Sequence, residues 1–61
     1  MFTVEELEEA LRAIASIISK CEKALPKLKE GTSQHTLLIR RIKALTIAAS
    51  LITQALEEQR A

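Results

Sequence analysis

The chain has 61 residues, 48% of them hydrophobic and 28% charged, with a formal net charge of +1. This composition is typical of a folded globular chain rather than a disordered one, and the near-neutral charge gives no overall attraction to nucleic acid or to an anionic membrane. One cysteine and one histidine exclude an internal disulfide and a four-ligand zinc site. A single domain this small buries little surface, so oligomerisation remains as its extra source of stability.

The first predicted helix begins at Thr3. Thr3 and Glu6 have the spacing of a capping box, and Phe2 and Leu7 flank them as a hydrophobic staple. Apolar residues then recur at alternating steps of three and four, which predicts an amphipathic helix with one packed seam. The seam positions are Val4, Leu7, Leu11, Ile14, Ile18, Cys21, Leu25 and Leu28. Three further positions widen the stripe: Ala10, Ile17 and Ala24.

Pro26 is the one residue that does not suit this helix, because proline removes a backbone hydrogen bond and crowds the preceding turn. We expect a kink near Pro26, after which the helix resumes. It is predicted to end at Gly31, which would be its C-cap in the left-handed conformation. Thr32 or Ser33 then caps a second helix, and so short a link makes the two helices antiparallel neighbours. The prediction is one domain over 1–61, with helices at about 3–30 and 34–59 and a loop at about 31–33.

The second predicted helix has a seam of its own, which faces the first. Its positions are Leu38, Ile42, Leu45, Ala49, Ile52 and Leu56. A second apolar row, interrupted only by Arg41, lies beside this seam, and Ile39 and Ile47 lie beyond its opposite edge. A helix with a single partner needs an apolar face only a little over 100° wide. The second helix has more apolar surface than one partner can cover, which predicts contacts outside the hairpin, most simply with another copy.

Charge divides the predicted hairpin into three zones. Residues 20–43, around the loop, hold seven basic and two acidic side chains, a charge of +5, whereas residues 1–12 with 53–61 hold two basic and six acidic ones, a charge of −4. The waist between them, residues 13–19 and 44–52, carries no charge, as is typical of the centre of a protein contact. The predicted protein interface consists of Ile17, Leu37, Ile39, Ala44, Thr46, Ile47, Ala48, Ser50, Leu51 and Ala55.

Candidate chemical groups are few. Cys21 occupies a seam position, where we expect core packing rather than a reactive thiol. His35 begins the second seam, where a polar or capping role is expected, because no Asp exists in the chain and no second His is present to act with it. We therefore predict no enzyme activity, no catalytic residues, no cofactor and no metal.

The chain carries no recognisable targeting or membrane signal. Its first residues are acidic where a signal peptide is basic and then apolar, and the longest charge-free run, Ala44 to Leu56, is shorter than the roughly 20 residues that cross a bilayer. A free thiol favours a reducing compartment. We expect a soluble cytoplasmic (or recombinant) protein with no membrane partner.

Nucleic acid is the main alternative use for the basic zone. Phe2 is the only aromatic residue available to stack on a base, and the lysines near the end of the first helix already complement its dipole. We therefore expect no nucleic-acid binding. In an antiparallel dimer, by contrast, the +5 zone lies beside the −4 zone, which favours one orientation.

The mixture of idealised and irregular features resembles computationally redesigned helical-hairpin subunits of self-assembling oligomers and cages. Asn, Asp, Trp and Tyr are absent, yet Pro26, Cys21 and His35 are not choices of an idealised design. The resemblance rests on small or apolar surface positions: Ile39, Thr46, Ile47 and Ser50, with Ala13 and Ser16 across from them. It implies an inherited oligomer core and an added contact at the waist.

Two functions follow as expectations. The first is a self-associating structural module: an all-α, antiparallel two-helix hairpin that oligomerises into a helical bundle. A dimer of hairpins is the simplest form and a trimer the next. The waist is then available to a second protein component. The alternative is an adaptor that offers the apolar face of the second helix to a different protein.

Overall fold

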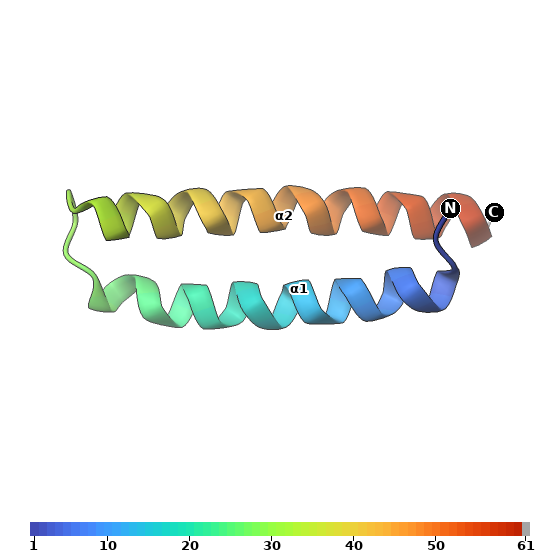
Figure 1. The fold of residues 1–61 in the computed structure, drawn as a ribbon, viewed down its shortest axis with the longest axis horizontal. Coiled ribbons are helices and arrows are strands. Elements are labelled where there is room, and N and C mark those ends of the chain that lie inside the picture. The colour runs from blue at the N-terminus through green and yellow to red at the C-terminus, as the bar shows by residue number, and fades with distance from the viewer. Residues whose placement is uncertain (61) are drawn as a thin grey trace.

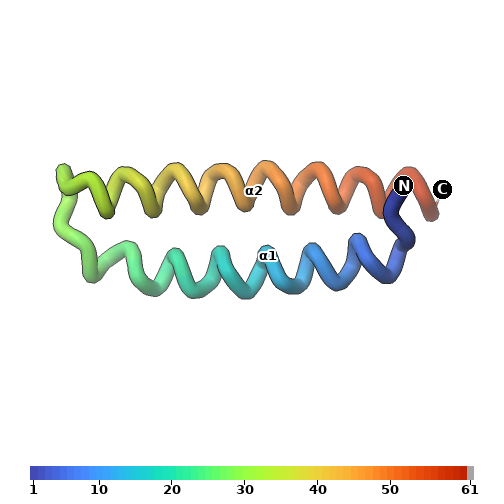
Figure 2. Tube along the Cα trace, viewed as in Figure 1, coloured from blue at the N-terminus to red at the C-terminus, as the bar shows by residue number. Residues whose placement is uncertain are grey.

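The computed structural model describes residues 1–60, which form a long hairpin of two antiparallel α-helices (Figure 1). Helix α1 spans Val4–Ala24, a short 3₁₀ helix η1 spans Leu25–Lys27, and α2 spans Ser33–Arg60. The two helices run side by side over their whole length, so both termini lie at the end opposite the loop (Figure 2). The molecule is a rod of 44 × 15 × 14 Å.

The start of α1 is the predicted capping box. The backbone N–H of Glu6 donates to Thr3 Oγ1 at 3.1 Å, and the backbone N–H of Thr3 donates to Glu6 Oε1 at 2.9 Å. Both groups would otherwise lack a partner within the helix.

Replacing Thr3 with alanine is expected to lower the free energy of unfolding by about 1 kcal/mol per chain, because the N–H of Glu6 loses its acceptor. Thr53→Ala is the matched control, since the Thr53 hydroxyl donates only to the Ala49 carbonyl inside α2 and alanine is the better helix former. Urea denaturation measures both changes. Equal losses in the two variants would contradict a specific role for the cap.

The end of α1 differs from the prediction. The α-helix stops at Ala24 and does not resume after Pro26, because proline has no N–H to continue the helical hydrogen bonds and its ring crowds the carbonyl four residues earlier. The chain tightens instead into η1, closed by the Leu28 N–H donating to the Leu25 carbonyl at 3.1 Å, and then becomes extended at Leu28. Leu28 nevertheless stays half-buried at its seam position.

The connection between the helices is therefore longer than predicted. Gly31 is left-handed as expected, with φ +86°, but it turns the chain toward α2 rather than closing α1. Thr32 caps α2: its Oγ1 accepts from the His35 N–H at 3.2 Å and its hydroxyl donates to the Lys29 carbonyl at 2.7 Å. Helix α2 then runs from Ser33 to Arg60, within one residue of the predicted ends.

Candidate self-association surface

The two predicted seams face each other and form the only core in the described residues. Every seam position of both helices is buried or half-buried, but just Leu7, Cys21 and Leu56 fall below a tenth exposed, at 8%, 8% and 5%. No side chain within residues 1–60 is completely shielded from water. A two-helix layer has one packed interface, so each helix leaves most of its circumference uncovered.

The uncovered area is large for the size of the chain. The accessible surface is 4914 Å², whereas a folded protein of 6.8 kDa exposes about 4,000 Å². The radius of gyration is 14.0 Å, against about 10.5 Å for a compact chain of this length. The excess, roughly 900 Å², is similar to the ~800 Å² that one partner contributes to a standard protein interface.

One broad side of the hairpin, which we call the apolar face, combines apolar residues of both helices. Ala10 and Ala55 line hollows that share Phe2 and Leu7, and at the loop end Ala24 shares a hollow with Leu37. On each helix, residues that lie three, four or seven positions further along are on the same side as these hollows and extend the apolar surface along the helix. The apolar face therefore comprises Phe2, Ala10, Ile17 and Ala24 with Leu37, Ala44, Ala48, Leu51 and Ala55.

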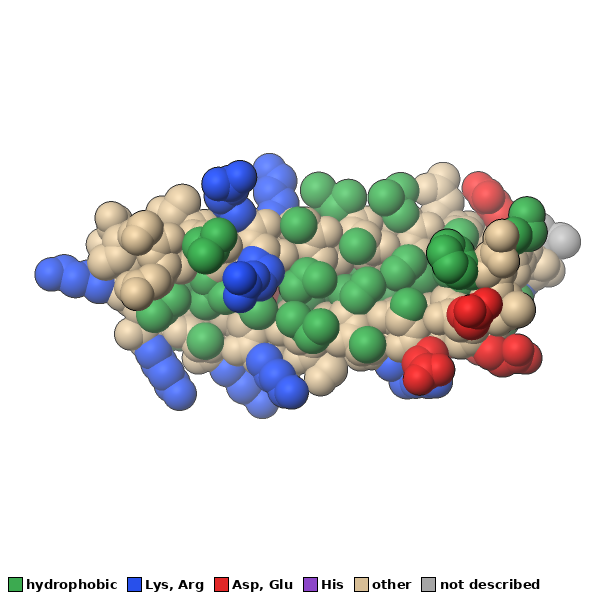
Figure 3. Space-filling view, viewed as in Figure 1, with side chains coloured by type: hydrophobic (Ala, Val, Ile, Leu, Met, Phe, Trp, Pro, Cys, Tyr) green, Lys and Arg blue, Asp and Glu red, His purple; other side chains and the backbone are tan. Residues whose placement is uncertain are grey.

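Large apolar side chains lie open to water on this face. Phe2 is 68% exposed, Leu51 60%, Leu37 53% and Ile17 44%. Figure 3 views this side of the rod and shows apolar side chains in a band along both helices, with basic groups toward the loop and acidic groups toward the termini. Arg41 interrupts the face beside Leu37. Contiguous exposed apolar surface with a polar rim is typical of an interaction site.

The opposite broad side of the hairpin is more polar. Arg60 forms an ion pair with Glu8 across the two helices, and both line a hollow with Arg12 and Ala15. Ile39 and Thr46 follow the same seven-residue spacing as Arg60 and so lie on this side of α2.

The predicted waist does not form one patch. Ile47 lies two residues from both Leu45 and Ala49 of the seam, so it projects from α2 away from α1. Ser16 is placed in the same way on α1, between Ile14 and Ile18, and projects in the opposite direction. The charge-free zone therefore encircles the rod, and the predicted placement of Ala13 and Ser16 across from Ile39, Thr46, Ile47 and Ser50 is wrong.

The ten predicted interface residues thus divide among three sides of the hairpin. The apolar face contains Ile17, Leu37, Ala44, Ala48, Leu51 and Ala55; the outer edge of α2 contains Ile47; the polar side and its border contain Ile39, Thr46 and Ser50. Phe2, Ala10 and Ala24 also belong to the apolar face but are absent from the predicted interface. For Ala10 and Ala24 the signal was present, because they are spaced by seven residues on either side of Ile17.

The titratable residues in the described region do not assemble into a reactive cluster. Cys21 is buried in the seam, as expected for core packing, and His35 is half-buried in the first turn of α2. Among residues 1–60, no three His, Cys or Glu side chains lie close enough together to hold a metal ion. Neither helix, as far as the structure describes it, is apolar over the length needed to cross a bilayer.

Comparison with protein-family models, with curated proteins and with solved structures finds no match to this chain.

Proposed function

We propose that the chain is a self-associating, non-enzymatic structural module in which copies of the hairpin pack through the apolar face into a helical bundle. The observation that carries the proposal is the exposure of Phe2, Leu37 and Leu51 on one continuous face. Burying a large apolar side chain contributes about 1.5–3 kcal/mol, and a hairpin with so small a core has much to gain from that burial.

A second copy is the occupant that the face suits best. The rod is 44 Å long and 15 Å wide, so the flat footprint of the face is about 660 Å², comparable with the ~800 Å² per partner of stable complexes. Its charges are also self-complementary, +5 around the loop and −4 at the termini. A dimer of hairpins is the simplest closed assembly and a trimer the next.

The test is the concentration dependence of thermal unfolding, followed by circular dichroism. If folding is coupled to dimerisation, Tm is expected to rise by about 5 °C for each tenfold increase in chain concentration. A folded chain whose Tm is independent of concentration would contradict self-association. That outcome would favour the alternative, an adaptor that offers the same face of α2 to a different protein.

Ile47 offers a second contact, at the position implied by the resemblance to redesigned assembly subunits. It is 53% exposed on the edge of α2 that faces neither α1 nor the apolar face. We expect Ile47→Glu to leave helicity unchanged and to remove the higher assembly, measured as mass by light scattering, while the bundle formed through the apolar face persists. An unchanged mass would show that the edge makes no contact.

A further inference from the structure

From the placement of charges beside the apolar face, we infer that two hairpins stack antiparallel across a two-fold axis at the level of Ile14 and Ala49. This inference rests on the proposed self-association and adds the orientation and register of the partner. In this arrangement α1 lies over α1 of the second copy, α2 lies over α2, and the loop of each hairpin meets the termini of the other.

The hollows between the helices establish which residues share a level. Leu7 shares hollows with residues of α2 from Ile52 to Gln59, and the centre of that range falls between Ala55 and Leu56. Seven residues further along α1, and seven residues back along α2, Ile14 and Ala49 therefore lie at about one level, close to the middle of the charge-free waist.

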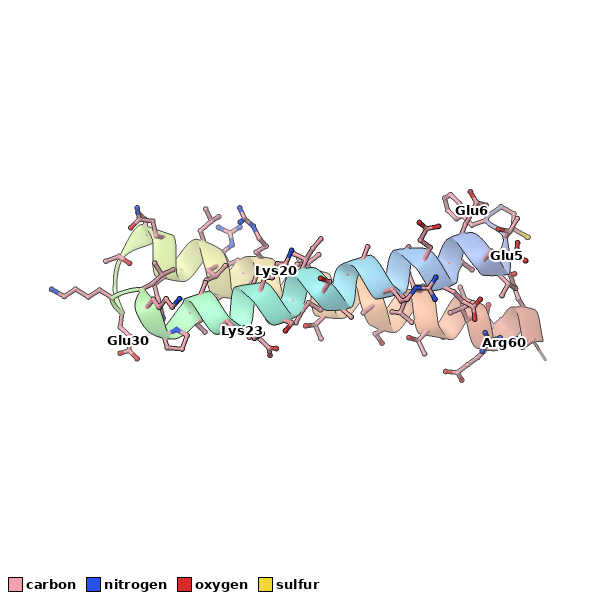
Figure 4. The ribbon with its side chains drawn as sticks, turned by 90° about the horizontal axis from the view of Figure 1, so that it is seen from below. Glu5, Glu6, Lys20, Lys23, Glu30 and Arg60 are labelled. Atoms are coloured by element: carbon pink, nitrogen blue, oxygen red, sulfur yellow. The ribbon has the colours of Figure 1, made fainter. Side chains whose placement is uncertain are left out.

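Charged residues flank the apolar face symmetrically about this level. On α1, Glu9 lines the hollow beside Phe2, and Lys20 follows Ile17 by three residues, which places it along the same edge. The midpoint between Glu9 and Lys20 falls between Ile14 and Ala15. Figure 4 shows Glu6, near Glu9 in the chain, and Lys20 in opposite halves of α1.

Helix α2 has the same arrangement about the same level. Glu58 lines a hollow with Ala55, and Arg41 lines the hollow that Ala24 and Leu37 share at the loop end. The midpoint between Arg41 and Glu58 falls between Ala49 and Ser50. Two independent charge pairs, one on each helix, therefore have a common centre.

A two-fold axis across the rod at that centre brings Lys20 to the level of Glu9 of the second copy, and Arg41 to the level of its Glu58. Both pairs then occur twice, beside the apolar contact. A two-fold axis along the rod, by contrast, leaves each residue at its own level and places Lys20 near Arg41 of the second copy, so that like charges meet. Electrostatic complementarity of this kind selects orientation.

The distance between nitroxide labels, measured by pulsed electron resonance, tests the orientation. A single label at Glu30→Cys in a Cys21→Ala background marks the loop, which Figure 4 shows at one extreme of the rod. The antiparallel stack predicts a separation close to the 44 Å length of the rod. A parallel dimer, or a trimer with its axis along the rod, predicts labels within roughly 20 Å, because packed helices lie about 10 Å apart.

A matched label at Ser16→Cys lies near the level of the proposed axis, so its separation is expected to be short in the antiparallel stack. Short distances from Glu30→Cys would overturn the antiparallel inference while leaving self-association intact. Absence of any dipolar coupling from both labels, together with the mass of a single chain, would instead overturn the proposed function.

A charge swap tests the register. Glu9→Lys alone is expected to raise the dissociation constant roughly tenfold at low salt, since each affected pair occurs twice in the dimer. Adding Lys20→Glu is expected to restore it, because the swapped side chains again meet with opposite charge. Additive losses in the double variant would overturn the pairing of Glu9 with Lys20.

Discussion

Leu51→Glu is expected to dissociate the assembled chain, raising the dissociation constant by more than about a hundredfold, or about 3 kcal/mol. Leu51 is 60% exposed in the single hairpin and lies in the middle of the apolar face. In a stacked dimer, glutamate at this position would place a carboxylate without a partner inside a dry contact, once on each copy. Sedimentation velocity at micromolar concentration measures the loss.

Gln54→Glu is the matched control for this substitution. It adds the same carboxylate to the same helix three residues away, at an exposed position between Thr53 and Ala55 that projects away from α1. The control is expected to sediment as the unmodified chain does. If Leu51→Glu sediments like the control, the apolar face is not the contact.

Leu56→Ala is expected to cost about 3 kcal/mol of unfolding free energy, the largest effect on stability of any single truncation in the chain. Leu56 is the least exposed of the described residues, at 5%, and it lies beside Leu11 near the open end of the hairpin. Removing it deletes buried methyl groups and leaves a cavity between two helices that have no second layer to close it. Urea denaturation at fixed chain concentration measures the change.

Ile39→Ala is the comparison for Leu56→Ala, since it also truncates an aliphatic side chain of α2 but at 45% exposure on the polar side. We expect a loss below about 1 kcal/mol there. A loss as large as that of Leu56→Ala would mean that the polar side is buried in the assembly, and the interface would have to be assigned to it.

The sequence was sufficient to predict the hairpin because its local signals agree with one another. The capping box at Thr3, the alternating steps of three and four, and the cap at Thr32 each specify one part of the same arrangement. The end of α1 was not predictable from the same signals, because the apolar repeat continues through Leu25 and Leu28. A repeat reports which residues face the core and is the same whether the backbone after Pro26 is helical or 3₁₀.

The surface was only partly predictable. Seven-residue spacing identified Ala44, Leu51 and Ile17 as positions outside the seam, but spacing along one helix does not say which side of the other helix they join. The relative rotation of the two helices places Ile17 and Leu51 on one side, and Ser16 and Ile47 on opposite edges. That rotation follows from how the two seams pack, which a single helix pattern does not contain.

The mass of the unmodified chain by sedimentation equilibrium, over a dilution series from micromolar concentration upward, tests whether the hairpin associates with itself. A self-associating hairpin is expected to show a discrete multiple of its 6.8 kDa mass, twice that value for the antiparallel stack, and to dissociate on dilution. A folded species that keeps the mass of one chain at every concentration would contradict self-association.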